Sequence, residues 1–225
     1  MARPPKTVRW QNMSPDEPAE MSEILARQGV AQNQIADIVS ALGARTIVLV
    51  GMMGSGKSTV GRRLAARLRL PFVDADHEIE TRHGGMTITE IFATHGEPYF
   101  REGEAKVISA LLDGGAQVLA TGGGAVLRED TRTRIHDKAV SIWLKADGPT
   151  VLRRVKRRSD RPLLQTEDPA STIERLIAAR EPFYSLADIS IVSRDVPHDK
   201  IVDECIEALH EYLCGNTSVA FANKT

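Results

Sequence analysis

From residue 45 onward, short apolar runs alternate with longer segments in which apolar residues recur at helical spacing. The short runs are rich in β-branched residues, which is typical of strands. Strands that alternate with helical segments indicate βαβ units, in which helices cover a parallel sheet. The pattern predicts an α/β fold, a three-layer α/β/α arrangement with a central five-stranded parallel sheet. The expected strands are Thr46–Val50, Pro71–Asp74, Gln117–Ala120, Ala139–Leu144 and Asp188–Val192.

Two of the longer segments carry an apolar residue at every fourth position. Because residues four apart lie on one face of a helix, each segment should pack that face against the sheet. Elsewhere, Thr87 and Glu90 fit a capping box that begins a short helix, and Gly96 is placed to end it. The apolar positions are Val60, Leu64 and Leu68 in the first segment and Ile201, Cys205 and Leu209 in the second.

The first 44 residues differ from the rest, because prolines punctuate a polar stretch and a weakly apolar segment, Met21–Leu42, follows. They carry acidic residues and no long apolar run, so they resemble neither a secretory signal nor a transit peptide. The division expected is an N-terminal extension (1–44), partly helical or disordered, one α/β domain (45–214) and a flexible tail (215–225). The apolar residues of the N-terminal extension could form one helical stripe that docks on the core or on a partner: Ile24, Ile35, Ile38, Val39 and Leu42.

Composition excludes several classes of protein. The chain is 42% hydrophobic and 26% charged, as in globular domains, and its net charge of −1 gives no global attraction to nucleic acid or membranes. The longest apolar run, at Ile47–Val50, is far too short to span a bilayer. The two cysteines, Cys205 and Cys214, form no disulfide framework. We therefore expect a cytoplasmic protein that binds neither nucleic acid nor membranes. We also expect it to be a monomer.

A phosphate-binding motif follows the first predicted strand. The run Gly51–Thr59 satisfies G-x-x-x-x-G-K-[ST] in full, and an amphipathic helical segment comes next. Glycines let successive N–H groups point inward, and the helix N-terminus adds partial positive charge at the same point. The motif predicts a nucleoside triphosphate, with Lys57 at its β and γ phosphates and the Ser58 hydroxyl on Mg²⁺. The nucleotide-binding residues expected are Gly54, Ser55, Gly56, Lys57, Ser58 and Thr59.

Two carboxylates follow the second predicted strand. Asp74 and Asp76 should emerge at the carboxyl edge of the sheet, where open α/β sheets bind ligands. On an extended strand they would point to the same side, so that one serves a metal near Ser58 and the other reaches a substrate hydroxyl. The structural alternative is that Asp76 caps the helix that begins ahead of His77.

The remaining candidates are a glycine run and several arginines. In Thr121–Gly124, three missing Cβ atoms would let a substrate lie against backbone N–H groups, although a plain turn is the competing explanation. Taken alone, Arg101 and Arg180 are typical of surface charges on helices. A basic cluster spans Arg153 to Arg161. With few aromatic residues and with acidic neighbours, it favours a mobile lid over transferring phosphate rather than a nucleic-acid site.

Taken together and in this order, six segments resemble those of the shikimate kinases. The resemblance covers about Thr46 to Leu213 and leaves the N-terminal extension outside. It implies a P-loop kinase fold with a mobile lid, related to the nucleoside monophosphate kinases. It also implies ATP-dependent phosphorylation of the shikimate 3-hydroxyl, giving shikimate 3-phosphate and ADP on the route to chorismate and aromatic amino acids. The segments are Gly51–Thr59, Phe72–Asp76, Phe100–Arg101, Thr121–Gly124, Arg161–Leu164 and Arg180–Tyr184.

The same resemblance assigns roles to individual residues. It implies that Lys57, Asp76 and Arg161 act in catalysis, and that Arg161 closes on the phosphates of ATP from the lid. Ser58 and Asp74 would organise Mg²⁺, and Arg154 is a candidate for stacking on adenine. Guanidinium groups and a carboxylate suit a small acid with three ring hydroxyls. The expected shikimate contacts are Asp76, Arg101, Gly123 and Arg180.

Two other functions stay open from the sequence. A different small-molecule kinase, such as a gluconate kinase, would share the phosphate-binding motif but need fewer carboxylate-binding arginines. A nucleotide-binding regulatory module without catalysis would use the extension to hold a partner. The second is disfavoured, since every chemical position named above is intact.

Overall fold

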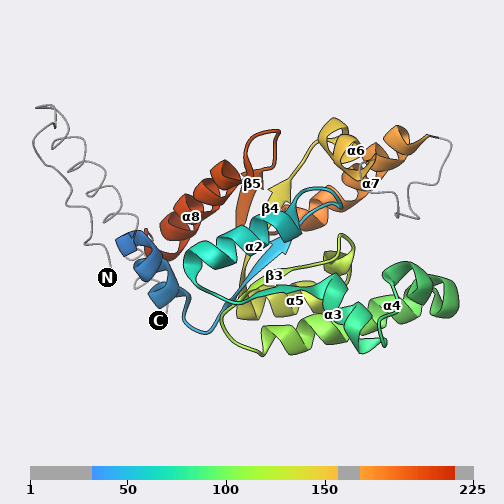
Figure 1. Cartoon of the computed structure of the whole chain (residues 1–225), viewed down its shortest axis with the longest axis horizontal. Helices are drawn as coiled ribbons and strands as arrows, with labels where there is room; N and C mark the ends of the chain where they lie inside the picture. The colour runs from blue at the N-terminus through green and yellow to red at the C-terminus, as the bar shows by residue number, and fades with distance from the viewer. Residues whose placement is uncertain (1–31, 157–167, 216–225) are drawn as a thin grey trace, which may run out of the picture.

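The computed structural model describes residues 32–156 and 168–215 and contains the expected parallel sheet (Figure 1). The strand order is β2-β3-β1-β4-β5, and every pairing between neighbours is parallel. The α/β prediction is confirmed, and each strand boundary lies within one residue of its expected place. The strands are β1 (Thr46–Val50), β2 (Phe72–Asp74), β3 (Val118–Ala120), β4 (Ala139–Lys145) and β5 (Ile189–Val192).

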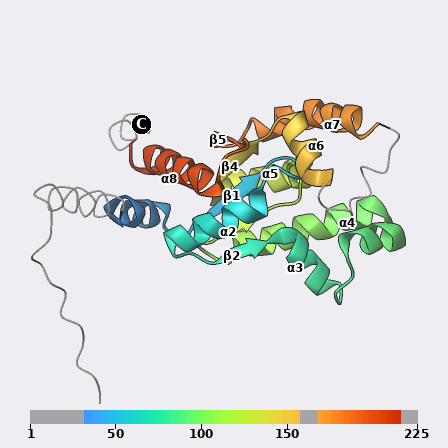
Figure 2. The same ribbon diagram turned by 45° about the horizontal axis from the view of Figure 1, so that its top comes forward.

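Helices cover both faces of the sheet, as the two views in Figures 1 and 2 show. One face carries α2 (Lys57–Leu68) and α8 (His198–Cys214). The other face is covered by α3 (Ala75–Arg82), α4 (Ile88–Leu112), the 3₁₀ helix η2 (Ala125–Leu127), α5 (Glu129–Lys138), α6 (Gly148–Lys156) and α7 (Pro169–Tyr184). No helix in the two described ranges has both the length and the apolar character needed to cross a membrane.

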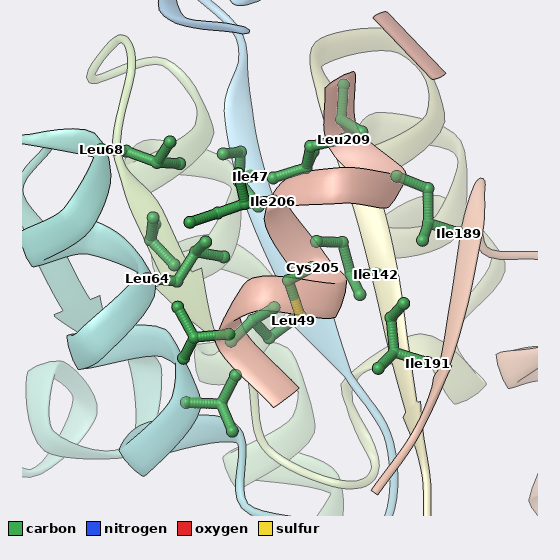
Figure 3. Close-up of a cluster of buried hydrophobic side chains, with 14 of the residues drawn as sticks. Ile47, Leu49, Leu64, Leu68, Ile142, Ile189, Ile191, Cys205, Ile206 and Leu209 are labelled. Carbon is green, nitrogen blue, oxygen red and sulfur yellow. The ribbon is translucent and has the colours of Figure 1, made fainter. Parts of the chain in front are cut away.

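The apolar stripes of α2 and α8 meet over the centre of the sheet (Figure 3). All six stripe residues are at most 2% exposed, which confirms the two faces expected from the spacing. They pack on Ile47 and Leu49 of β1 and on Ile142 of β4, so the central strands are buried beneath both helices. A buried core at this place fixes the direction of β1, the strand that leads into the phosphate-binding motif.

Local signals set the ends of the helices near the site. The capping box is present, because the Thr87 hydroxyl accepts from the N–H of Glu90 and the Glu90 carboxylate accepts from the N–H of Thr87. Gly96 does break the helix, with φ 82° and ψ 167°, a conformation that favours glycine. A second helical stretch follows at once, so α4 is kinked rather than ended there.

The described part of the N-terminal extension is a helix over 32–42 that packs on the core. Ile38 and Leu42 are 0% and 1% exposed and belong to the same cluster as α2 and α8. Arg45 donates hydrogen bonds to the carbonyls of Ala41 and Leu42 at the C-terminal end of this helix. Of the two alternatives for this stripe, the core or a partner, the structure shows docking on the core for Ile38 and Leu42. Ile24 lies outside the described residues.

We expect Leu42→Ala to lower the free energy of unfolding by about 2–4 kcal/mol, because it leaves a cavity in the main core. Ser40→Ala, on the exposed side of the same helix, is the matched control and should change that value little. Urea denaturation followed by circular dichroism measures both. Equal stability of the two variants would show that the helix contributes nothing to the core.

Candidate active site

The phosphate-binding loop joins β1 to α2 at the carboxyl edge of the sheet. At Gly51, with φ 137°, a Cβ atom would lie 2.7 Å from the carbonyl oxygen of Leu144 in β4, so only glycine lets the loop pass. Gly56 precedes α2 with φ 98°, and neither a side-chain cap nor an acidic residue is present in the first turn of α2. The N–H groups at this end can therefore bind an anion.

Lys57 lies within this loop and is only 8% exposed. Its Nζ donates to the carbonyl oxygens of Gly51 at 2.7 Å and Met52 at 2.8 Å. The ammonium group is thus held at the wall of a cleft of about 360 Å³ that the loop, Asp74, Asp76 and Gly123 also line. This location suits a positive charge that meets the phosphates of a nucleotide.

The two aspartates do not lie on one extended strand, which corrects the geometry expected from the sequence. β2 ends at Asp74, and Asp76 already belongs to the first turn of α3. Asp74 is the N-cap, since its Oδ1 accepts from the N–H of Asp76 at 3.1 Å, so the capping role considered for Asp76 was wrong. Both residues still line the cleft.

Ser58 and Asp74 form a close pair of oxygen atoms. The Ser58 hydroxyl donates to Asp74 Oδ2 at 2.6 Å, which joins the first turn of α2 to the end of β2. No cluster of three or more His, Cys, Asp or Glu residues suited to a metal occurs in the described ranges. One hydroxyl and one carboxylate beside a phosphate site fit the demands of Mg²⁺, which keeps several waters and takes few protein ligands.

Arg101 of α4 and Arg180 of α7 converge on the glycine run after β3. A Cβ on Gly124 would lie 2.5 Å from Nη1 of Arg101, and a Cβ on Gly123 would lie 3.5 Å from Nη1 of Arg180. The two guanidinium groups therefore reach adjacent residues of one loop. Arg180 is 8% exposed and the Arg101 side chain 18%, so neither is a plain surface charge.

Glu104 lies against the same glycine run and beside Arg101, although the sequence analysis missed it. It is 2% exposed, and its Oε2 accepts from Arg101 Nη1 at 2.7 Å. Its Oε1 has no hydrogen-bond partner among the described residues, and a Cβ on Gly122 would approach that atom to 2.5 Å. The available signal was spacing, because Glu104 comes three residues after Arg101 on a helix. Burial raises the pKa of Glu104, with the Arg101 charge acting in the opposite direction.

Arg154 also lines the cleft, beside the phosphate-binding loop. Its guanidinium donates to the carbonyl of Gly54 at 3.3 Å, to the Ser193 hydroxyl at 2.8 Å and to the carbonyl of Arg194 at 2.8 Å. These contacts connect α6, the loop and the end of β5. Arg161 and the rest of the expected lid segment lie outside the described residues.

Comparison with known proteins shows the family to which the chain belongs. The family model described as shikimate kinase matches residues 53–210, more than half of the chain. The chain belongs to the shikimate kinase family. A relative from Rhodopseudomonas palustris named shikimate kinase is 66% identical over 195 residues, which are 86% of this chain and 96% of that protein. A second, from Bradyrhizobium diazoefficiens, is 71% identical over 180 residues, 80% of this chain and 86% of that protein.

A solved structure of the family extends the comparison to three dimensions. The shikimate kinase from Acinetobacter baumannii, in complex with shikimate, has a TM-score of 0.71 and 36% identity. The match covers 78% of this chain and 96% of that one. The P-loop kinase fold expected from the sequence is therefore confirmed, with the five-stranded sheet that the family shares.

We expect Glu104→Gln to gain stability relative to wild type as pH rises. Because burial raises the pKa of Glu104, the folded protein holds that proton more tightly than the unfolded chain. Wild type then loses stability as pH rises from the ordinary value near 4.5 through the raised value. The difference in thermal unfolding midpoint, variant minus wild type, should increase as the pH rises above about 4.5.

Glu102→Gln is the matched control for this experiment. Glu102 is exposed, and a hydrogen bond from Lys106 lowers its pKa. Its contribution to stability is therefore lost only at acidic pH. Its midpoint difference should stay flat over the same range. A flat or falling difference for Glu104→Gln would contradict the raised pKa.

Proposed function

We propose that the chain transfers the γ-phosphoryl group of ATP to the 3-hydroxyl of shikimate, giving shikimate 3-phosphate and ADP. This reaction belongs to the route to chorismate and the aromatic amino acids. The observation that carries the proposal is the convergence of Arg101 and Arg180 on adjacent glycines, beside a complete phosphate-binding loop. A phosphate cradle next to a paired guanidinium site is what a kinase acting on a small carboxylate needs.

Arg101 and Arg180 bind the carboxylate of shikimate in this proposal. Guanidinium groups match a carboxylate with paired hydrogen bonds, and their partial burial strengthens the attraction. Arg101 is already oriented by Glu97 and Glu104, which accept from its nitrogen atoms at 3.1 and 2.7 Å. The complex of the Acinetobacter baumannii enzyme with shikimate supports this choice of acid.

Two carboxylates accept hydrogen bonds from the substrate hydroxyls. Asp76 lies in the cleft close to Gly122, where it orients the attacking 3-hydroxyl toward the nucleotide. A strong base is not required, because the hydroxyl loses its proton late in a loose phosphoryl-transfer transition state. Glu104 offers Oε1, for which no described residue is a donor, to another ring hydroxyl.

The phosphates are held by the loop N–H groups, by Lys57 and by Arg161. Lys57 meets developing negative charge on the transferring group, and positioning with electrostatics supplies most of the rate. Ser58 and Asp74 would hold Mg²⁺, which when bound neutralises charge on the β and γ phosphates. Arg161 is assigned by its place in the family motif, and we propose that it adds positive charge as the lid closes.

The decisive experiment is a coupled ADP-release assay with ATP, Mg²⁺ and either shikimate or gluconate. We expect turnover with shikimate alone, and we expect Asp76→Asn and Lys57→Ala to abolish it while the circular dichroism spectrum stays unchanged. Each variant removes a group that touches substrate or phosphate. Turnover of gluconate without turnover of shikimate would refute the proposal, and ATP binding without ADP release would indicate a non-catalytic module.

Gly124→Ala should weaken shikimate binding selectively. Its φ of −104° suits any residue, so the added methyl group strains no backbone and instead pushes the Arg101 guanidinium aside. We expect the KM for shikimate to rise about tenfold or more, because a charged hydrogen bond is displaced. The KM for ATP should stay within about twofold of wild type.

Gly103→Ala is the control for this substitution. It lies on α4 two residues after Arg101, and the nearest atom to an added Cβ is 4.0 Å away. Both KM values should therefore match those of wild type. If Gly124→Ala behaved like Gly103→Ala, the substrate carboxylate would have to bind elsewhere.

A further inference from the structure

Tyr184 ends α7, and its hydroxyl reaches both the glycine run and Met52 of the phosphate-binding loop. It is 2% exposed, and its hydroxyl donates to the carbonyl oxygen of Gly123 at 2.5 Å. Arg180, one helical turn earlier, donates to the same oxygen at 3.3 Å. One carbonyl of the glycine run therefore receives two donors from a single helix face.

We propose that Tyr184 is a positioning residue that holds the Gly122–Gly124 run in the shape that binds shikimate. This inference rests on the proposed function. The C=O of Gly123 and the N–H of Gly124 share one planar peptide unit, so fixing the oxygen fixes the direction of that N–H group. Tyr184 thereby sets the orientation of a backbone donor beside the guanidinium of Arg101.

The two donors have different tasks in this arrangement. The Arg180 bond to Gly123 is long, and the guanidinium gives it up at little cost when a carboxylate binds. The carbonyl then keeps the short bond from Tyr184 and is never left without a donor. Tyr184 thus frees Arg180 for the substrate while the loop stays in place.

The ring of Tyr184 is fixed from two sides. It stacks on Trp143 of β4, with ring centroids 6.0 Å apart and an angle of 29°, and its hydroxyl lies 3.7 Å from Sδ of Met52. Burial raises the pKa of Tyr184, so the hydroxyl keeps its proton and remains a donor. These contacts hold the hydroxyl between the glycine run and Met52 of the phosphate-binding loop, with the shorter hydrogen bond going to Gly123.

Tyr184→Phe tests the inference, because it removes the hydroxyl and keeps the ring. We expect the KM for shikimate to rise about 3- to 10-fold, the effect of one neutral hydrogen bond. The KM for ATP should change by less than about twofold. Calorimetric titration of shikimate into the protein should show the same loss of affinity in the absence of turnover.

Tyr212→Phe is the matched control, since that hydroxyl also makes a hydrogen bond, to Asp188 at 2.8 Å, but lies on α8. Both of its KM values should equal those of wild type. An unchanged shikimate KM in Tyr184→Phe, or equal increases in both KM values, would overturn the inference. Failure of the wild-type protein to turn over shikimate would instead refute the proposed function, so the two failures are distinguishable.

Discussion

The whole site depends on glycine backbone that neighbouring groups can approach closely, at the carboxyl edge of two neighbouring strands, β1 and β3. After β1, Gly51 passes within contact of the Leu144 carbonyl, and after β3 the glycine run lies against the ends of buried polar side chains. A side chain at these positions would occupy the space that phosphate, hydroxyl or carboxylate groups need. The parallel pairing of β1 with β3 brings the two glycine segments to one edge, where the proposed function places both substrates.

Charge balance explains how this edge can hold so many buried ionic groups. Removing an ion from water is costly unless a partner compensates, and here Glu104 pairs with Arg101 while Asp74 accepts from Ser58 and from the start of α3. The orientation of each group is thus set before substrate arrives. Preorganised donors and acceptors of this kind need little rearrangement during phosphoryl transfer.

Much of this architecture could be predicted from the sequence, because strands, amphipathic helices and the phosphate-binding motif are local patterns. The strand ends and the capping box at Thr87 follow from residues near each other in the chain. The position of Asp76 was harder to predict, since whether this residue ends a strand or begins a helix is decided by the N-cap at Asp74. Glu104 lies in no quoted motif, and Tyr184 ends the Arg180–Tyr184 segment without an assigned role, because only tertiary packing brings the two side chains to the glycine run.

The helix over 32–42 contributes no residue to the proposed active site, but it belongs to the folded core. The family model matches only from residue 53, yet the cluster beneath α2 and α8 is completed by Ile38 and Leu42. A protein shortened to begin at β1 would keep the residues that the proposed function uses and would expose the apolar surface of the α2–α8 cluster that this helix covers. Its shortened form would therefore be prone to aggregate before it lost its active site.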